Sequence, residues 1–243
     1  MLIIENPPLD IFRIDFKFKK PKEISFETMA KVEELLKISF PNVPSLKIIE
    51  YPFDAQIEIE TPILFGPIKF QNQDKSGQIQ LFSNGLIFIF TKYSRWEETK
   101  KEITELLFKT CEILKVNSIE QFRIEYIDKF LLPQENFKLS DYFTLNINKQ
   151  KDWEIDYKDF HLGIKILSNE SDKFIIRLRG LPPKNEEQFL FKLEILYLKK
   201  NLFLLDNKEA LVNQLDTIHD YIKGYFKNIL SAKLKNIIGV REE

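Results

Sequence analysis

The sequence predicts an α+β protein with a largely antiparallel, curved sheet and long helices on one face. Apolar and polar residues alternate with a period of two in several short segments, which is typical of half-buried strands. Other segments carry apolar residues at helical spacing, so each of these helices has one buried side. The strand segments cluster between the helices without strict strand-helix-strand alternation, and this order favours antiparallel pairing.

The first half of the chain, residues 1–116, begins with a predicted strand at 12–19, where apolar residues alternate with charged ones. Ser25 is in position to cap a helix that extends to about residue 39, just before two prolines. Three further strands are predicted, at 46–50, 55–61 and 68–72.

A predicted hairpin then leads directly into a long helix. Its two apolar runs are separated by Ser83-Asn84-Gly85, and Asn-Gly readily supplies the positive φ angles of a tight turn. Ser94 and Glu97 have the spacing of a capping box at the start of the helix. One side of this helix carries the predicted buried stripe, which consists of Trp96, Thr99, Ile103, Leu107, Thr110 and Leu114.

The second half, residues 117–243, repeats this order of elements. A final helix of about 30 residues is predicted from Asp206 to Ile237, with Glu209 completing a capping box. The shared order suggests a duplicated β-α-β-β-β-α unit, with the two halves joined in one compact structure. The other elements predicted in this half are a strand at 122–130, a short helix at 139–143, and strands at 161–167, 174–179 and 189–197.

Composition limits the classes of function. With 36 basic and 37 acidic side chains, the chain lacks the overall positive charge of a protein that coats nucleic acid or an anionic membrane. The single cysteine precludes an internal disulfide framework and suits a reducing cytoplasm. No export signal or membrane-spanning run is evident. We therefore expect a cytoplasmic protein that does not insert into membranes.

Four segments together resemble a known family. They are Asn6-Pro7-Pro8-Leu9, the strand and Trp-initiated helix from Leu86 to Trp96, the strand Arg123-Ile-Glu-Tyr126, and the helix with Leu215-Asp216-x-x-His219. In these segments the chain is similar to sporadically distributed, uncharacterised bacterial and archaeal proteins of similar length. Asp128 is a departure, because the family pattern more often has Asn after the tyrosine strand. The patchy distribution of the family implies mobile genes, and therefore a role in phage defence or toxin neutralisation with a partner encoded nearby.

The residues give little support for catalysis. Cys111 lies beside the buried stripe of a predicted helix, where a small thiol is ordinary. Glu58 and Glu60 share one face of a predicted strand and could bind a hard cation, but solvated charges are the simpler interpretation. The 7 glycines form no phosphate-binding motif, and no Cys/His metal spacing occurs. We expect no cofactor and no metal.

Basic side chains are the candidate binding residues. On the predicted strands they project from the side opposite the apolar residues, where cross-strand pairing with Asp15, Glu125 and Glu194 would explain them without any ligand. Alternatively, they form a surface for an acidic protein, a nucleic-acid backbone or a nucleotide. His219 is a further candidate, although a histidine bonded to a neighbouring strand is the simpler interpretation. The candidates are Arg13, Lys17, Arg123, Arg177, Arg179, Lys192 and His219.

The sequence therefore favours a non-enzymatic binding protein that interacts with another protein. The alternative is a nucleic-acid-binding protein, or a metal-independent RNase, that uses the Arg/Lys face of the sheet.

Overall fold

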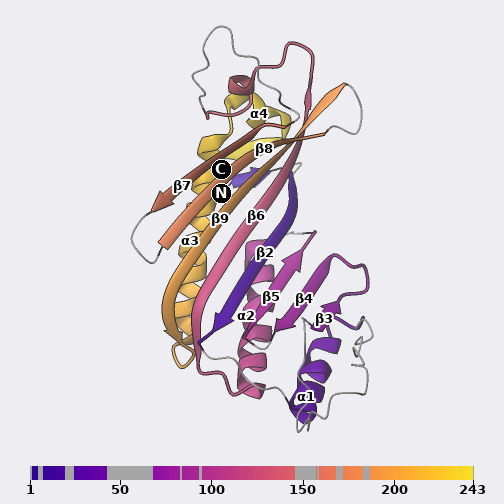
Figure 1. Ribbon diagram of the computed structural model, residues 1–243, viewed down its shortest axis with the longest axis vertical. Helices are drawn as coiled ribbons and strands as arrows, with labels where there is room; N and C mark the ends of the chain where they lie inside the picture. Colours follow the sequence, from indigo (N-terminus) through magenta and orange to yellow (C-terminus); the bar gives the residue numbers. More distant parts are fainter. Residues whose placement is uncertain are drawn as a thin grey trace, which may run out of the picture. The chain divides into compact units, whose positions relative to one another are not determined.

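The computed structural model (Figure 1) describes residues 2–4, 8–19, 25–42, 68–82, 84–92, 95–145, 157, 159–167, 172–182 and 187–242. Four of the predictions lie outside the described residues: the strands at 46–50 and 55–61, the capping residue Ser94, and the pair Glu58 and Glu60.

Apart from β1 and β10, which were not predicted, the described elements have the predicted types and nearly the predicted order, which confirms the α+β fold class. They are β1 (Leu2–Ile4), β2 (Leu9–Phe18), α1 (Phe26–Lys37), β3 (Ile68–Gln71), β4 (Gly77–Phe82), β5 (Gly85–Phe90), α2 (Trp96–Ile113), β6 (Ser118–Pro133), the 3-10 helix η1 (Leu139–Asp141), β7 (His161–Leu167), β8 (Asp172–Leu181), β9 (Gln188–Leu204), α3 (Lys208–Ile229), α4 (Ala232–Ile237) and β10 (Val240–Glu242).

Eight of the strands form one sheet, in the order β3-β4-β5-β2-β6-β9-β8-β7, while β1 pairs with β10. The pairs β3-β4, β4-β5, β7-β8 and β8-β9 are antiparallel. From one edge of the sheet to its middle, the first half of the chain contributes β3-β4-β5-β2. From the other edge to the middle, the second half contributes β7-β8-β9-β6. The predicted repetition in element order therefore extends to the order of strands in the sheet.

The chain divides into two compact units that differ from the two sequence halves. Unit 1 consists of Met1–Phe12, Ile124–Lys199 and Val212–Glu243, and unit 2 consists of Arg13–Arg123 and Lys200–Leu211. The predicted boundary between residues 116 and 117 falls inside unit 2.

The core of unit 2 is rich in aromatic side chains. Ile14, Phe16 and Phe18 of β2 are buried, as the alternating pattern predicted. The Phe16 ring lies 6.2 Å from that of Phe88 on β5 and 6.4 Å from that of Phe122 on β6, between ring centroids. Helix α2 lies behind the strands of this unit in Figure 1 and packs against α1. Its predicted stripe is buried except at Trp96, which is half-buried.

The predicted hairpin is present, but its glycine has a different role. Phe82 pairs directly with Gly85, so the turn is short, and Gly85 already belongs to β5. Its φ angle is not positive. A Cβ atom there would collide with the backbone carbonyl oxygen of Phe16 on the neighbouring strand. Gly85 is therefore required by the close approach of two strands, not by turn conformation.

Helix α2 begins at Trp96, with Arg95 at the N-cap position and no capping hydrogen bond from a side chain. In α1, by contrast, the Ser25 hydroxyl accepts a hydrogen bond from the Thr28 amide, as predicted.

The core of unit 1 lies between its strands and α3. Buried side chains of β6, including Ile124 and Phe130, face this core, and α3 buries Leu215 and Ile218. At the end of the sheet, Phe137 stacks on Phe191 with ring centroids 5.4 Å apart.

The prediction of one continuous final helix is wrong. Helix α3 ends at Ile229, and α4 begins at Ala232. At the break, the Ser231 amide donates to the Tyr142 carbonyl at 2.9 Å, and its hydroxyl donates to the Asp141 carbonyl at 2.5 Å. These bonds hold Ser231 outside helical geometry, and its hydroxyl also caps α4.

Two details of this final region also differ from the prediction. Asn207, not Asp206, caps α3, because its side-chain oxygen accepts from the Ala210 amide at 3.0 Å. Ile237 belongs to the apolar side of the predicted final helix and was expected to be buried, but it is 51% exposed, and Ile238 is buried instead.

Candidate binding face

One face of the unit 1 sheet carries most of the predicted binding residues. Opposite partners in an antiparallel pair project to the same side of a sheet. The register places His161, Arg179 and Lys192 in one row across β7, β8 and β9, and Gly163, Arg177 and Glu194 in the next. We call the Lys, Arg and His side chains of this side the basic face; it consists of His161, Lys165, Lys173, Arg177, Arg179 and Lys192.

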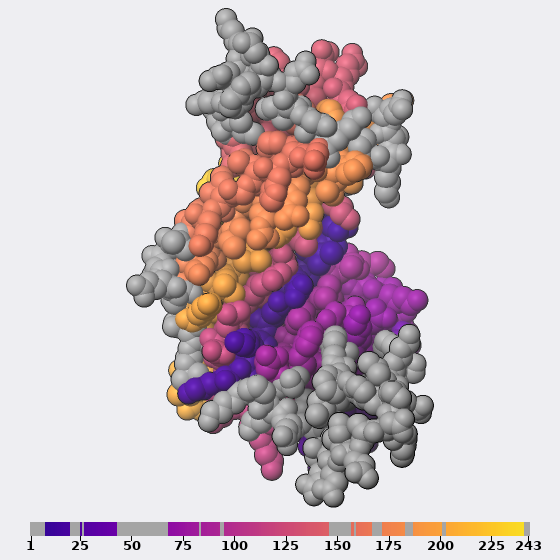
Figure 2. All heavy atoms as spheres, in the orientation of Figure 1, coloured from indigo at the N-terminus to yellow at the C-terminus, as the bar shows by residue number. Residues whose placement is uncertain are grey.

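The basic face is on the opposite side of the sheet from α3. Phe174, whose side chain alternates with those of the basic face along β8, contacts Tyr225 of α3 with ring centroids 5.0 Å apart. Figure 2 shows the strands β7, β8 and β9 from the side of the basic face, in salmon to orange, with no helix over them.

Arg177 and Glu194 form an ion pair on this face, and the carboxylate is its buried member. The Arg177 guanidinium donates to the Glu194 carboxylate, and the Lys192 amine lies 3.6 Å from its other oxygen. Glu194 is only 6% exposed, and burial alone would raise its pKa. The charge and hydrogen bond of Arg177, the charge of Lys192 and a hydrogen bond with Glu125 outweigh burial, so the pKa of Glu194 is lowered. These groups stabilise one another in the absence of a ligand.

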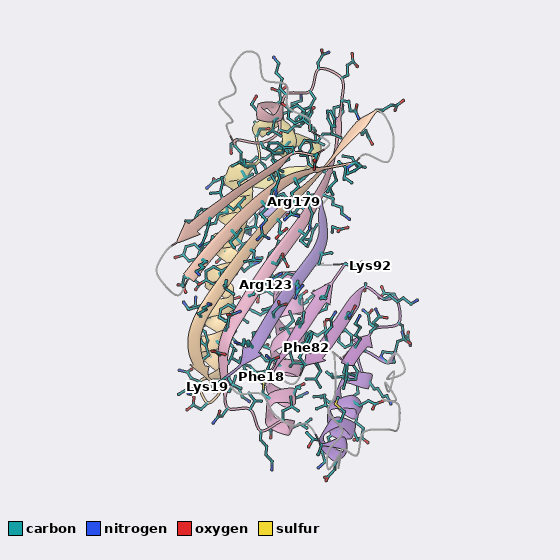
Figure 3. All side chains as sticks on the ribbon, viewed as in Figure 1. Phe18, Lys19, Phe82, Lys92, Arg123 and Arg179 are labelled. Carbon is teal, nitrogen blue, oxygen red and sulfur yellow. The ribbon has the colours of Figure 1, made fainter. Side chains whose placement is uncertain are left out.

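Arg179 differs from the other predicted arginines. The Nε atoms of Arg123 and Arg179 are both buried without a hydrogen bond, but Arg123 has an ion pair with Asp15, whereas no described residue gives Arg179 a hydrogen bond or an ion pair. Figure 3 marks its position on β8. Its cross-strand neighbours are His161 and Lys192, which supply no carboxylate. A buried cationic N–H without an acceptor is costly, and the Arg179 guanidinium has no counter-charge among the described residues.

The predicted residues of unit 2 are paired within that unit. Arg13 makes two hydrogen bonds to Asp15, at 2.7 and 2.9 Å, and the Nε of Arg123 lies 3.8 Å from the same carboxylate. Lys17 lies 3.1 Å from Glu120. The contacts of Lys17 and Arg123 join β2 to β6 and support the cross-strand pairing interpretation, whereas Arg13 pairs with an aspartate of its own strand. The prediction of a single surface shared with Arg177, Arg179 and Lys192 stays a prediction.

His219 does not belong to the basic face. It lies on α3, and its Nδ1 atom is 2.8 Å from the hydroxyl of Tyr126 on β6. This geometry agrees with the simpler interpretation, a histidine at the boundary between helix and sheet that is hydrogen-bonded to a strand.

Sequence reasoning missed a buried acid on the helix-facing side. Asp128 is 4% exposed, and burial together with the nearby Asp10 charge raises its pKa to about 8. The signal was present in the sequence: Asp128 occupies an apolar position of the strand, two residues after Tyr126 and two before Phe130.

Other groups give no support for catalysis. Burial raises the pKa of the Cys111 thiol to about 12, so its nucleophilic thiolate is scarce at neutral pH. Within the described residues, no group of three or more His, Cys, Asp or Glu side chains could hold a metal ion.

No helix of the described part has the length and apolar character needed to cross a membrane.

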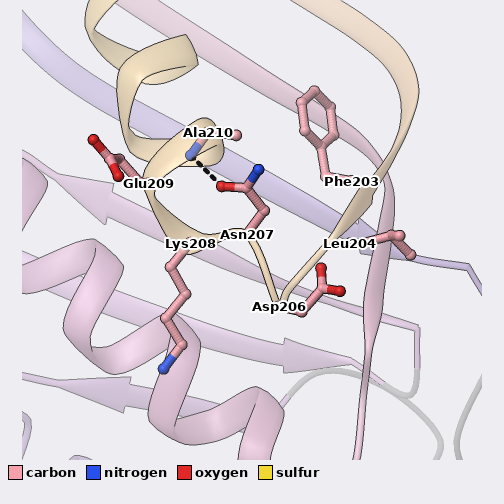
Figure 4. Close-up of a pocket in the computed structure, with 7 residues that line it drawn as sticks. All are labelled: Phe203, Leu204, Asp206, Asn207, Lys208, Glu209 and Ala210. Carbon is pink, nitrogen blue, oxygen red and sulfur yellow. Dashed lines mark hydrogen bonds between the residues drawn. The ribbon is translucent and has the colours of Figure 1, made fainter.

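Unit 2 has two surface depressions. The first has a volume of about 820 Å³ at the turn between β9 and α3. Figure 4 shows residues that line it, among them Lys208, Glu209 and Asn207, whose side chain accepts a hydrogen bond from the Ala210 amide. The second, of about 420 Å³, lies between α1 and α2 and is lined by Leu35, Leu106 and several charged side chains. Neither depression contains a residue predicted to bind or to react.

Comparison of the chain with family models gave no match, and comparison with curated proteins gave none either. The resemblance to the sporadically distributed prokaryotic family, and the role in genome conflict that it implies, therefore stay predictions.

Proposed function

We propose that the chain is a non-enzymatic binding protein whose basic face binds an acidic region of another protein. The observation that carries this proposal is the state of Arg179, whose buried Nε has no acceptor among the described residues. An arginine can bind a carboxylate through two parallel hydrogen bonds, so one Asp or Glu of a partner would satisfy it.

Charge supports an acidic ligand. On β7, β8 and β9, the basic face has five Lys or Arg side chains against one carboxylate, that of Glu194. This local excess of positive charge occurs in a chain whose net charge is −1, so it belongs to the face and not to the molecule as a whole.

The apolar side chains of this face favour a protein over a nucleic acid. Ile175 and Leu198 are half-buried between the cations, and Leu196 is buried. Protein interfaces combine apolar side chains with arginine in this way. Proteins that bind single-stranded nucleic acid instead present aromatic rings for base stacking, and the described positions of this face on β7, β8 and β9 include no Phe, Tyr or Trp.

The carboxyl pair Glu125 and Glu194 supports binding over acid-base catalysis. Both residues are buried, at 5% and 6% exposure, and Arg177 and Lys192 hold Glu194. A substrate would have to displace these cations before it could reach the Glu194 carboxylate. The expected partner, a protein encoded near this one in a mobile conflict system, is part of this proposal.

A binding assay with a charge-reversal variant tests the proposal. The probe is a fluorescent peptide of alternating Glu and Leu, and its affinity is measured by anisotropy for the wild type and for Arg179→Glu. We expect the variant to bind about tenfold more weakly or worse, because it loses a charge-assisted bidentate contact. Wild-type affinity should fall as salt increases.

The matched control is Lys31→Glu, which changes the net charge equally on the exposed surface of α1. Equal affinity for Arg179→Glu and the wild type, with the peptide bound, would show that Arg179 is not part of the binding surface. The same titration with single-stranded RNA tests the alternative function. RNA that binds more tightly than the peptide, with a steep dependence on salt, would favour the nucleic-acid interpretation.

A further inference from the structure

The free edge of the sheet at β7 is a second feature of the basic face. β7 is the last strand in the sheet order, and only β8 pairs with it among the described strands. At seven residues it is roughly 23 Å long. Edge strands with unpaired backbone groups can accept a strand from another chain.

The pattern of hydrogen bonds between β7 and β8 shows which backbone groups of β7 point away from β8. The Gly180 amide donates to the Phe160 carbonyl at 2.8 Å, so these two residues form a hydrogen-bonded pair. In an antiparallel ladder, hydrogen-bonded pairs alternate with pairs that are not hydrogen-bonded to each other. The next pair in the register, His161 opposite Arg179, is therefore a non-hydrogen-bonded pair. The N–H and C=O groups of His161, Gly163 and Lys165 therefore point away from β8, toward the open edge. All three residues are exposed.

The two sides of β7 differ in character. His161 and Lys165 project on the basic face, beside Arg179 and Ile175 of β8. On the other side Leu162, Ile164 and Ile166 are half-buried. A strand added at this edge would have acidic residues on one side and apolar residues on the other, because side chains alternate along a strand.

A second copy of this chain fits the edge poorly. An antiparallel pair of two β7 strands centred on Gly163 would place Lys165 of each copy opposite His161 of the other. Neither residue offers the other a carboxylate, whereas an acidic strand would place opposite charges beside Lys165.

We propose that an extended segment of the partner protein, with acidic residues alternating with apolar ones, binds by adding a strand to the free edge of β7. Its backbone pairs with His161, Gly163 and Lys165, and its acidic side chains lie on the basic face beside His161 and Lys165, from where one can reach toward Arg179 on the next strand. This inference rests on the proposed function and specifies the mode of binding.

Backbone methylation of the probe tests strand addition directly. The probe is the alternating Glu and Leu peptide, seven residues long to match β7, in two N-methylated forms. In each form, alternate amides are methylated, so one form loses the amides that face β7 and the other loses those that face solvent. We expect one form to bind about tenfold more weakly or worse and the other to bind like the unmethylated peptide, because only one set of amides makes backbone bonds.

The protein offers a matched pair of variants at one position. Gly163→Pro removes an outward N–H without touching the ladder to β8, and it should weaken peptide binding severalfold. Gly163→Ala keeps the N–H, and its Cβ would meet nothing within 4 Å, so it should bind like the wild type. Hydrogen exchange of the wild type gives a measurement that does not depend on how the proline variant folds: the amides of Gly163 and Lys165 should become protected when the peptide binds.

The outcomes separate this inference from the proposed function. Peptide binding that depends on Arg179 but leaves both amides unprotected, with equal affinity of the two methylated forms, would overturn strand addition and leave the basic face as the binding surface. Absence of peptide binding would overturn both. A wild-type dimer in sedimentation that Gly163→Pro converts to a monomer would assign the edge to a second copy and overturn the acidic partner strand.

Discussion

Asp128 predicts an unusual dependence of stability on pH. Its pKa is about 8 in the folded chain, against an ordinary value of 3.8, so between these pH values the folded chain keeps a proton that the unfolded chain has lost. Stability therefore falls as pH rises through this window. At about 1.4 kcal/mol per pH unit, the loss on going from pH 4 to pH 8 is on the order of 5 kcal/mol.

Asp128→Asn removes this titration while preserving the size of the side chain. We expect the variant and the wild type to have similar free energies of unfolding near pH 4. The variant should become the more stable protein as pH rises, by several kcal/mol at pH 8. Urea unfolding of both proteins at each pH measures the difference. Asp10→Asn should shift the wild-type transition to lower pH, because the Asp10 charge helps to raise the pKa of Asp128.

Asp74→Asn is the matched control. Asp74 is also an aspartate, but hydrogen bonds from Ser76 and Lys92 lower its pKa, so its contribution to stability has the opposite sign and is lost as pH falls. The reasoning about Asp128 is refuted if the wild type and Asp128→Asn lose stability in parallel between pH 4 and pH 8.

Three further predictions concern packing and paired polar groups. Arg177→Ala should lower the free energy of unfolding by roughly 3 kcal/mol, because it leaves Glu194 buried without its main partner, and adding Glu194→Gln should recover part of the loss in urea titrations. Tyr126→Phe should lower it by about 1 kcal/mol through loss of the hydrogen bond to His219, and an equally stable variant would mean that this bond contributes nothing. Gly85→Ala should lower the free energy of unfolding by about 2 kcal/mol, since its Cβ would overlap the Phe16 carbonyl oxygen. Gly163→Ala, whose Cβ would meet open space, should be nearly neutral when both variants are compared by thermal unfolding.

Local patterns predicted the elements well. The alternation along β2 and β6 identified their buried sides, and Ser25 marked the start of α1 correctly. Strand alternation and helix capping depend on residues that are close in sequence, so they can be identified from the sequence alone. The break between α3 and α4 was not predictable in this way, because the carbonyls that hold Ser231 come from η1, some 90 residues earlier.

The candidate site was predictable only in part. Strand alternation placed Arg177, Arg179 and Lys192 on one side of the sheet. The pairing register was needed to show that Glu194 neutralises Arg177 while Arg179 has no such partner among the described residues. Lys165 was missed for the same reason, since its membership of the face depends on which strand lies beside β7.

The mirrored strand order has a consequence for how the chain could be divided. β2 of the first half adjoins β6 of the second, so the halves meet along a hydrogen-bonded seam in the middle of the sheet. A nick in the link between α2 and β6 would leave that seam chemically intact. The two pieces on either side of this link, produced separately, should therefore bind each other in solution and re-form the sheet, as in fragment complementation. Either piece alone would expose an edge strand with unpaired backbone groups and would tend to self-associate.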